Sequence, residues 1–164
     1  MKTAKLIILN LCLLALFASC KDTYEWSTYE PIEIEYSSIN FDQSPDNKFD
    51  YYGELSSSPA TVSFIPLVRL KCWGCVTSVR LDDVYLVPID IEAPVTDSVP
   101  VGSKTIYEGE WGSLGYYKES EEDNYSIVVD FTENTSGSPR TLSIHLSDAY
   151  AMANVNLTQS AGQE

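Results

Sequence analysis

Two cysteines separated by two residues are the most closely grouped reactive side chains of this chain. Cys72 and Cys75 flank a Trp-Gly pair, a spacing found in thiol redox centres, in half of a zinc site and in pinned turns. A zinc site needs about four ligands, and the only histidine of the sequence is His145. A redox centre needs the pair at the start of a helix, whereas residues 76–79 (VTSV) have the composition of a strand. We therefore interpret the segment as a pinned turn.

A hairpin is the simplest structure that places Cys72 opposite Cys75. In this interpretation residues 67–71 and 76–80 pair as antiparallel strands, and Gly74 supplies the positive φ that a two-residue turn requires. One face of the ribbon is then mostly apolar and the other mostly polar, as a half-buried hairpin requires. In an exported protein we expect the two thiols to form a disulfide, with no metal bound.

The predicted hairpin presents Trp73 at its tip, with Arg69, Lys71 and Arg80 on the strands beside it. Two interpretations remain open. The positive charges protect an edge strand from unwanted pairing, or they form a contact patch for an acidic or hydroxyl-rich partner such as a glycan, which stacks on Trp73.

A second aromatic group lies near the middle of the chain. Tyr116 and Tyr117 are candidate ligand contacts, although adjacent residues of a strand point to opposite faces, so at most one is available. His145 has Asp148 nearby but no recognisable serine motif. The acidic segment 119–124 lacks the spaced aspartates and the glycine of a calcium loop. We expect no catalytic residue and no cofactor, and therefore not an enzyme.

The N-terminus indicates the compartment. Lys2 and Lys5 precede an apolar run at residues 6–17, which is the pattern of a secretory signal and too short to span a membrane as a mature helix. Residues 17–20 (FASC) resemble the bacterial lipobox. This resemblance implies cleavage before Cys20 and acylation of that cysteine, and several acyl chains anchor a protein stably. We expect an outer-membrane lipoprotein that faces the cell surface, with a periplasmic orientation as the alternative.

Charge limits the partners of the exported chain. All 24 Asp and Glu but only 8 of the 10 Lys and Arg follow residue 19, so the formal charge is −16 after cleavage against −14 for the whole sequence. Such a chain is repelled by phosphate backbones, which excludes nucleic acid as a partner. The 145 residues that remain of 164 suit a single domain with a hydrophobic core.

Alternation of apolar and polar residues is the main structural signal. It is clear at residues 32–36, 127–131, 141–146 and 153–158, whereas residues 84–91 are apolar on both sides, as in a covered strand. Short strands with one polar face each, separated by turn-rich segments, predict an all-β, immunoglobulin-like antiparallel β-sandwich. We expect a signal peptide at 1–19, an acidic tether with one strand at 20–48, and the sandwich at 49–164.

The C-terminal third resembles the BACON domain, an immunoglobulin-like module of secreted Bacteroidetes proteins. The resemblance covers residues 108–162 and rests on an Asn, an Arg, two alternating strands, a Gln and a preceding Trp, which are here Asn134, Arg140, residues 142–146 and 155–157, Gln159 and Trp111. It implies an immunoglobulin-like fold in which Trp111 is a core residue. It also implies carbohydrate or mucin binding, or service as a spacer.

Two functions follow from these expectations. The first is a non-catalytic, surface-displayed module that binds glycan or assists in glycan handling, with Trp73 as its leading contact. The alternative is a spacer or protein-interaction component of a cell-surface assembly, with no small-molecule ligand.

Overall fold

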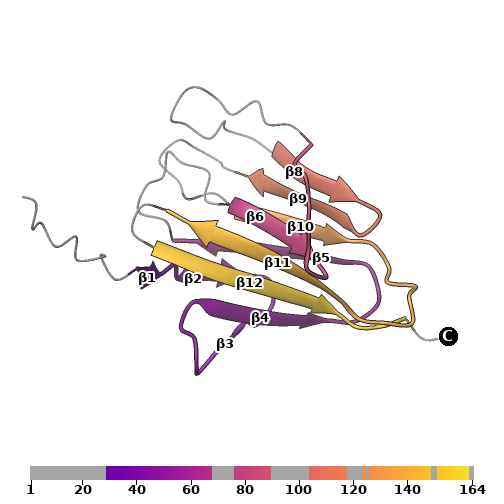
Figure 1. Cartoon of the computed structure of the whole chain (residues 1–164), viewed down its shortest axis with the longest axis horizontal. Coiled ribbons are helices and arrows are strands. Elements are labelled where there is room, and N and C mark those ends of the chain that lie inside the picture. The colour runs from indigo at the N-terminus through magenta and orange to yellow at the C-terminus, as the bar shows by residue number, and fades with distance from the viewer. Residues whose placement is uncertain are drawn as a thin grey trace, which may run out of the picture.

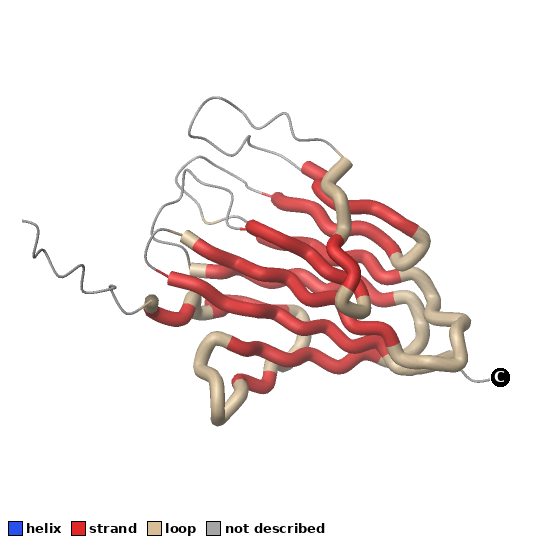
Figure 2. The backbone as a smooth tube through the Cα atoms, viewed as in Figure 1, coloured by secondary structure: helices blue, strands red, loops and turns tan. Residues whose placement is uncertain are grey.

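The protein is built from two β-sheets packed face to face (Figures 1 and 2). The computed structural model describes residues 29–67, 76–89, 104–117, 124, 126–148 and 151–162, with the backbone alone at 104–106, 116 and 117. All regular elements within these ranges are strands. None of the described residues belongs to a helix that is long and apolar enough to cross a membrane.

Sheet A, the front sheet in Figure 1, contains seven strands in the order β3-β4-β12-β11-β6-β7, with β1 also paired to β12. Its strands are β1 (Glu30–Pro31), β3 (Asp42–Gln43), β4 (Asp50–Leu55), β6 (Val76–Leu81), β7 (Val84–Tyr85), β11 (Arg140–Ser147) and β12 (Ala151–Gln159). Strands β1 and β4 run parallel to β12, and the other neighbours are antiparallel.

Sheet B contains five antiparallel strands in the order β2-β5-β10-β9-β8. They are β2 (Ile34–Ser37), β5 (Ala60–Pro66), β8 (Lys104–Gly109), β9 (Gly112–Tyr117) and β10 (Ser126–Phe131). The chain crosses from sheet B to sheet A between β2 and β3, between β5 and β6 and between β10 and β11. Two packed sheets between which the chain crosses repeatedly form a β-sandwich, and the predicted fold class, an all-β sandwich, is confirmed.

The core lies between the sheets and is formed by the inward rows that alternation predicts. The fully buried rows include Ile127 and Val129 on β10, Leu142 and Ile144 on β11, and Val155 on β12. This agrees with the period of two along a strand that has one covered face.

Trp111 closes the core at the turn between β8 and β9. It is 4% exposed, and its ring packs edge-on against Phe131 with 6.0 Å between centroids. The sequence prediction of Trp111 as a core residue therefore agrees with its position.

The folded unit begins earlier than the predicted boundary at residue 49. Ile32 is fully buried, and its N–H donates to the carbonyl of Met152 over 3.0 Å. Strands β1, β2 and β3 all precede residue 49 and pair with the two sheets. Residues 30–48 are thus part of the sandwich, because two edges of the sheets need the strands that this segment supplies.

The predicted covered strand at residues 84–91 is wrong over its described part. Strand β7 is only two residues long, and the exposed fractions of Val84, Tyr85, Val87 and Ile89 are 66%, 67%, 83% and 57%. The segment is exposed because β7 lies at the edge of sheet A, after a turn in which Asp82 and Asp83 have φ of 47° and 69°. Two-residue hairpin turns require such positive φ values.

The base of the predicted hairpin around residue 73 is also wrong. The N–H of Leu67, which follows β5 of sheet B, donates to the carbonyl of Glu33, the residue before β2 of the same sheet. Arg80 instead pairs with Ser143 on one side and Tyr85 on the other in sheet A. Alternation alone does not distinguish a chain that reverses within one sheet from a chain that crosses to the facing sheet, as this one does. Whether the two cysteines form a disulfide stays a prediction, since residues 68–75 lie outside the described residues.

Candidate functional site

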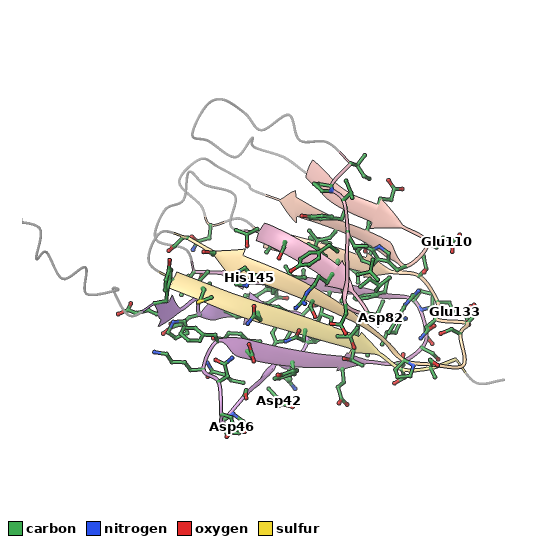
Figure 3. The ribbon with its side chains drawn as sticks, viewed as in Figure 1. Asp42, Asp46, Asp82, Glu110, Glu133 and His145 are labelled. Carbon is green, nitrogen blue, oxygen red and sulfur yellow. The ribbon has the colours of Figure 1, made fainter. Side chains whose placement is uncertain are left out.

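The outer face of sheet A carries a polar groove, which is our candidate site. It has a volume of about 620 Å³, and its floor consists of the outward side chains of β11 and β12, with walls from β4, β6 and β7. Figure 3 shows this face, with His145 on β11. The groove lies on this side because the inward residues of the same strands form the core, which leaves every second residue facing solvent.

Hydrogen bonds between neighbouring side chains order the floor of the groove. They join Thr141 to Thr158 over 3.0 Å, Ser143 to Asn156 over 2.8 Å and His145 to Asn154 over 2.6 Å. Each pair occupies directly opposite positions of the antiparallel ladder, where side chains lie close enough to interact. The floor is therefore a preordered surface of hydroxyl, amide and imidazole groups.

The orientation of His145 follows from a chain of hydrogen bonds that ends at Asp50. Asn154 donates its Nδ2 to Asp50 Oδ1 over 2.7 Å, and Asn47 donates to Asp50 Oδ2 over 2.9 Å. An ionised carboxylate only accepts hydrogen bonds, so Asn154 must direct its amide nitrogen to Asp50 and its oxygen to His145. The imidazole then carries a proton on Nδ1, and in the neutral ring Nε2 is left as a hydrogen-bond acceptor.

Two exposed tyrosines wall the groove at its two sides. Tyr52 on β4 and Tyr85 on β7 are 45% and 67% exposed. The register places them at the ends of one row across the strands, with Asn156, Ser143 and Arg80 between them. Four spacings of about 4.8 Å separate the ends of this row, which is about 19 Å in all. The guanidinium of Arg80 lies 5.5 Å from the centre of the Tyr85 ring.

Carboxylates surround the groove. Asp42 pairs with Tyr52 and Glu54 pairs with Thr158, while Asp82 and Asp83 form the turn before β7. Figure 3 shows Asp42 beyond β4 and Asp82 near the end of β6. Asp82 accepts a hydrogen bond of 2.7 Å from the N–H of Thr141.

A second polar cluster lies at the end of the sandwich and has a structural role. Gln159 is fully buried and donates to the carbonyls of Ser57, Ser58 and Thr132 over 2.8–3.1 Å, while its oxygen accepts from Arg140 Nε over 2.8 Å. Burial lowers the pKa of Arg140, and the nearby charge of Asp82 opposes this shift. Because the polar atoms of Gln159 already have protein partners, this cluster joins loops of the sandwich and offers no ligand site.

Of the residues in the predicted contact patch, Arg80 lies in the groove. Tyr116 and Tyr117 belong to β9 in sheet B, opposite Ile127 and Ser126 of β10, and their side chains are not described. Cys20, Arg69, Lys71, Trp73 and the pair Cys72 and Cys75 lie outside the described residues. Arg80 is thus the described candidate that the structure brings to the outer face of sheet A.

The sequence pattern predicts part of the groove. The outward residues of β11 and β12 are visible as alternating hydroxyl and amide positions, with His145 among them. Tyr52 and Tyr85 had no such signal, because β4 joins β12 from about 100 positions away along the chain. Moreover, the sequence predicts that residues 84–91, which include Tyr85, form a strand buried on both faces.

Comparison with known proteins adds one observation. No family profile and no curated protein sequence matches the chain. Among solved structures the chain is similar to one described as the NMR structure of the protein from Bacteroides thetaiotaomicron, with a TM-score of 0.54 and 13% sequence identity, over 88% of this chain and 99% of that chain. The likeness is one of fold. It agrees with the β-sandwich and gives no information about ligand or activity.

Proposed function

We propose that this chain is a non-catalytic, lipid-anchored module of the bacterial outer membrane that binds glycan in the groove on the outer face of sheet A. The observation that carries the proposal is the combination of an ordered, hydrogen-bonding floor with an exposed tyrosine at each side. In this proposal the groove, and not Trp73 as the sequence predicts, leads the contact with the ligand.

The chemistry of the floor suits sugar hydroxyls. Ser143 and His145 each use one hydrogen-bonding position within the floor. A hydroxyl oxygen has two lone pairs and an imidazole has a second nitrogen, so both retain capacity for a ligand. Asn154 and Asn156 each direct one amide N–H to the protein, to Asp50 and to the carbonyl of Tyr51, and each retains a second N–H. A ligand with many hydroxyl groups can pair with such a floor without moving it.

The tyrosines provide the apolar contact that a sugar ring also needs. Tyr52 and Tyr85 have rigid rings with a polar edge, and fixing such a ring costs little conformational entropy. Their exposure leaves ring surface available to a ligand. A sugar ring can stack on the tyrosine while its hydroxyls meet the polar floor.

The resemblance to BACON domains supports the fold class of this proposal more than its binding site. Three residues that carry the resemblance are Asn134, Arg140 and Gln159. Arg140 and Gln159 are hydrogen-bonded to each other, and Asn134 donates to carbonyls of Ser138 and Ser160. These residues hold the end of the sandwich together and lie apart from the groove. Display at the membrane rests on acylation of Cys20.

Substitution of Tyr52 by alanine tests the proposed site. Glycan binding by the exported chain, measured calorimetrically against a panel of polysaccharides, should fall about tenfold in Tyr52→Ala, which corresponds to about 1.4 kcal/mol. Tyr36→Ala is the matched control, because Tyr36 is 56% exposed on β2 of the other sheet. Equal affinities of Tyr52→Ala and the parent would place the site elsewhere. The absence of binding to every polysaccharide of the panel would refute the function.

A protein-interaction component is the second candidate function. It is favoured by the exposed apolar residues Val84, Val87 and Ile89 at and beyond the β7 edge of sheet A. A photo-crosslinking residue at position 87 should then give an adduct of defined mass on intact cells, whereas the same residue at the exposed Glu133 should not. No adduct at position 87 would count against this function.

A further inference from the structure

We infer that the groove takes a linear, uncharged polysaccharide segment several sugar units long, which lies across the strands from Tyr52 to Tyr85. The inference rests on the proposed function and adds two properties of the ligand, its length and its charge. Each property follows from a different feature of the outer face of sheet A.

Length follows from the register of the strands. Tyr52 pairs with Asn156, Asn156 with Ser143, Ser143 with Arg80, and Arg80 with Tyr85. Residues opposite one another in neighbouring strands share a face, so these five side chains form one row across sheet A. Because about 19 Å separates the ends of the row, a single sugar ring cannot contact both tyrosines. A linear chain can stack at each end and place its hydroxyls on Asn156 and Ser143 between them.

Charge follows from the groups around the row. On the described part of this face, five carboxylates lie in or beside the groove, namely those of Asp42, Asp50, Glu54, Asp82 and Asp83. Arg80 is the cation within the row, and its guanidinium already lies over the Tyr85 ring and 4.0 Å from Asp83. A sulfate or carboxylate on the ligand would enter a region of like charge, which repels it.

A cationic ligand would be attracted by the carboxylates around the groove more than by the groups of its floor. Both oxygens of Asp50 already accept hydrogen bonds, from Asn154 and Asn47, and Asp82 accepts from the N–H of Thr141. The carboxylates closest to the floor thus serve the protein's own donors. The groups that remain for a ligand on the floor are hydroxyls, amides and one imidazole, which match an uncharged sugar.

The length property is tested with oligomers of the uncharged polysaccharide that the panel selects. Their affinity should rise with the number of sugar units and level off once the oligomer reaches both tyrosines. Tyr85→Ala should remove the gain shown by long oligomers, about tenfold, while short oligomers that stack on Tyr52 keep their affinity. Tyr36→Ala should follow the parent at every length. A disaccharide that binds as tightly as the long oligomers would overturn this part of the inference.

The charge property is tested with dextran and dextran sulfate, or with the corresponding pair for the selected polymer. At low ionic strength the sulfated form should bind at least tenfold more weakly, and the gap should narrow as salt screens the carboxylates. The double variant Asp42→Asn with Glu54→Gln should narrow the difference in affinity between the two polymers even at low ionic strength. Tighter binding of the sulfated form would overturn the charge property and leave glycan binding intact. If neither form nor any other glycan binds, the proposed function itself fails.

Discussion

Gln159 shows how one buried side chain holds several loops in place. It is fully buried at the end of β12, and it bonds Ser57, Ser58, Thr132 and Arg140. Burying a polar group is costly unless it is hydrogen-bonded, and here each of its atoms has a partner. Removing its amide would break all four of these hydrogen bonds at once.

We predict that Gln159→Met destabilises the protein by about 1–3 kcal/mol, because methionine fills the space but removes every hydrogen bond of the buried amide. Denaturant unfolding of the exported chain measures the change. Gln43→Met is the control, since Gln43 is exposed and bonds the carbonyl of Lys48, and we expect it to stay within about 1 kcal/mol of the parent. A Gln159→Met protein as stable as this control would show that the network adds no stability.

The family resemblance named residues of this end of the sandwich but not their contacts. Asn134, Arg140 and Gln159 are grouped in the sequence by the resemblance to the BACON domain. Ser57, which accepts from Gln159, lies 102 positions earlier in the chain. A pattern along the sequence has no information about a partner that distant. For the same reason the sequence did not predict that Tyr52 and Tyr85 lie on either side of the groove.

At the scale of elements, the tight connection between β8 and β9 depends on Gly112. This residue has φ of 133°, and a Cβ at its position would overlap the carbonyl oxygen of Asp130 on the neighbouring strand β10. L-residues with a side chain rarely adopt this φ. The connection also fixes Trp111, whose carbonyl accepts from the N–H of Thr132 over 3.0 Å.

We predict that Gly112→Ala destabilises the protein by about 3 kcal/mol or more, because both φ and the contact with Asp130 oppose a methyl group. Gly137→Ala is the matched control, since a Cβ at Gly137 would meet nothing within 4 Å, and its effect should stay within about 0.5 kcal/mol. Thermal unfolding of both variants measures the difference. Equal melting temperatures would contradict the described geometry of the turn.

Strand pairing separates what the sequence predicted at this scale from what it did not. The hairpin of β11 and β12 was predictable, because both strands alternate and a short turn joins them. The parallel pairing of β4 with β12 and the crossing from β5 to β6 are long-range. Alternation specifies which face of a strand is buried, but it does not specify the neighbour.

At the scale of the whole molecule, the segment before residue 49 is part of the fold. We predict that a chain beginning at residue 44 is less stable than one beginning at residue 29, since it lacks β1, β2, β3 and the buried Ile32. Loss of a buried isoleucine alone costs about 2–5 kcal/mol. Thermal unfolding compares the two chains. Within the longer chain, Ile32→Ala should lower the melting temperature and Tyr36→Ala should not. Two equally stable chains would restore the boundary at residue 49.

Two buried phenols couple the stability of the whole sandwich to alkaline pH. Burial raises the pKa of Tyr107, and burial together with the charge of Glu33 raises the pKa of Tyr51, both from an ordinary value of 10.0. Above about pH 10 the unfolded chain releases these protons while the folded chain retains them. The folded state then binds more protons than the unfolded state, so the free energy of unfolding falls as pH rises.

We therefore predict that the contribution of Tyr51 and Tyr107 to stability is fully present below about pH 10 and is lost as pH rises through their raised pKa values. The double variant Tyr51→Phe with Tyr107→Phe should show a shallower loss of stability above this pH than the parent. Tyr36→Phe should follow the parent, because Tyr36 is 56% exposed. The measurement is the denaturant midpoint of each protein at pH values below and above about pH 10. General repulsion in this acidic chain acts on all three proteins alike, so identical slopes would mean that repulsion, and not the buried phenols, causes the alkaline loss.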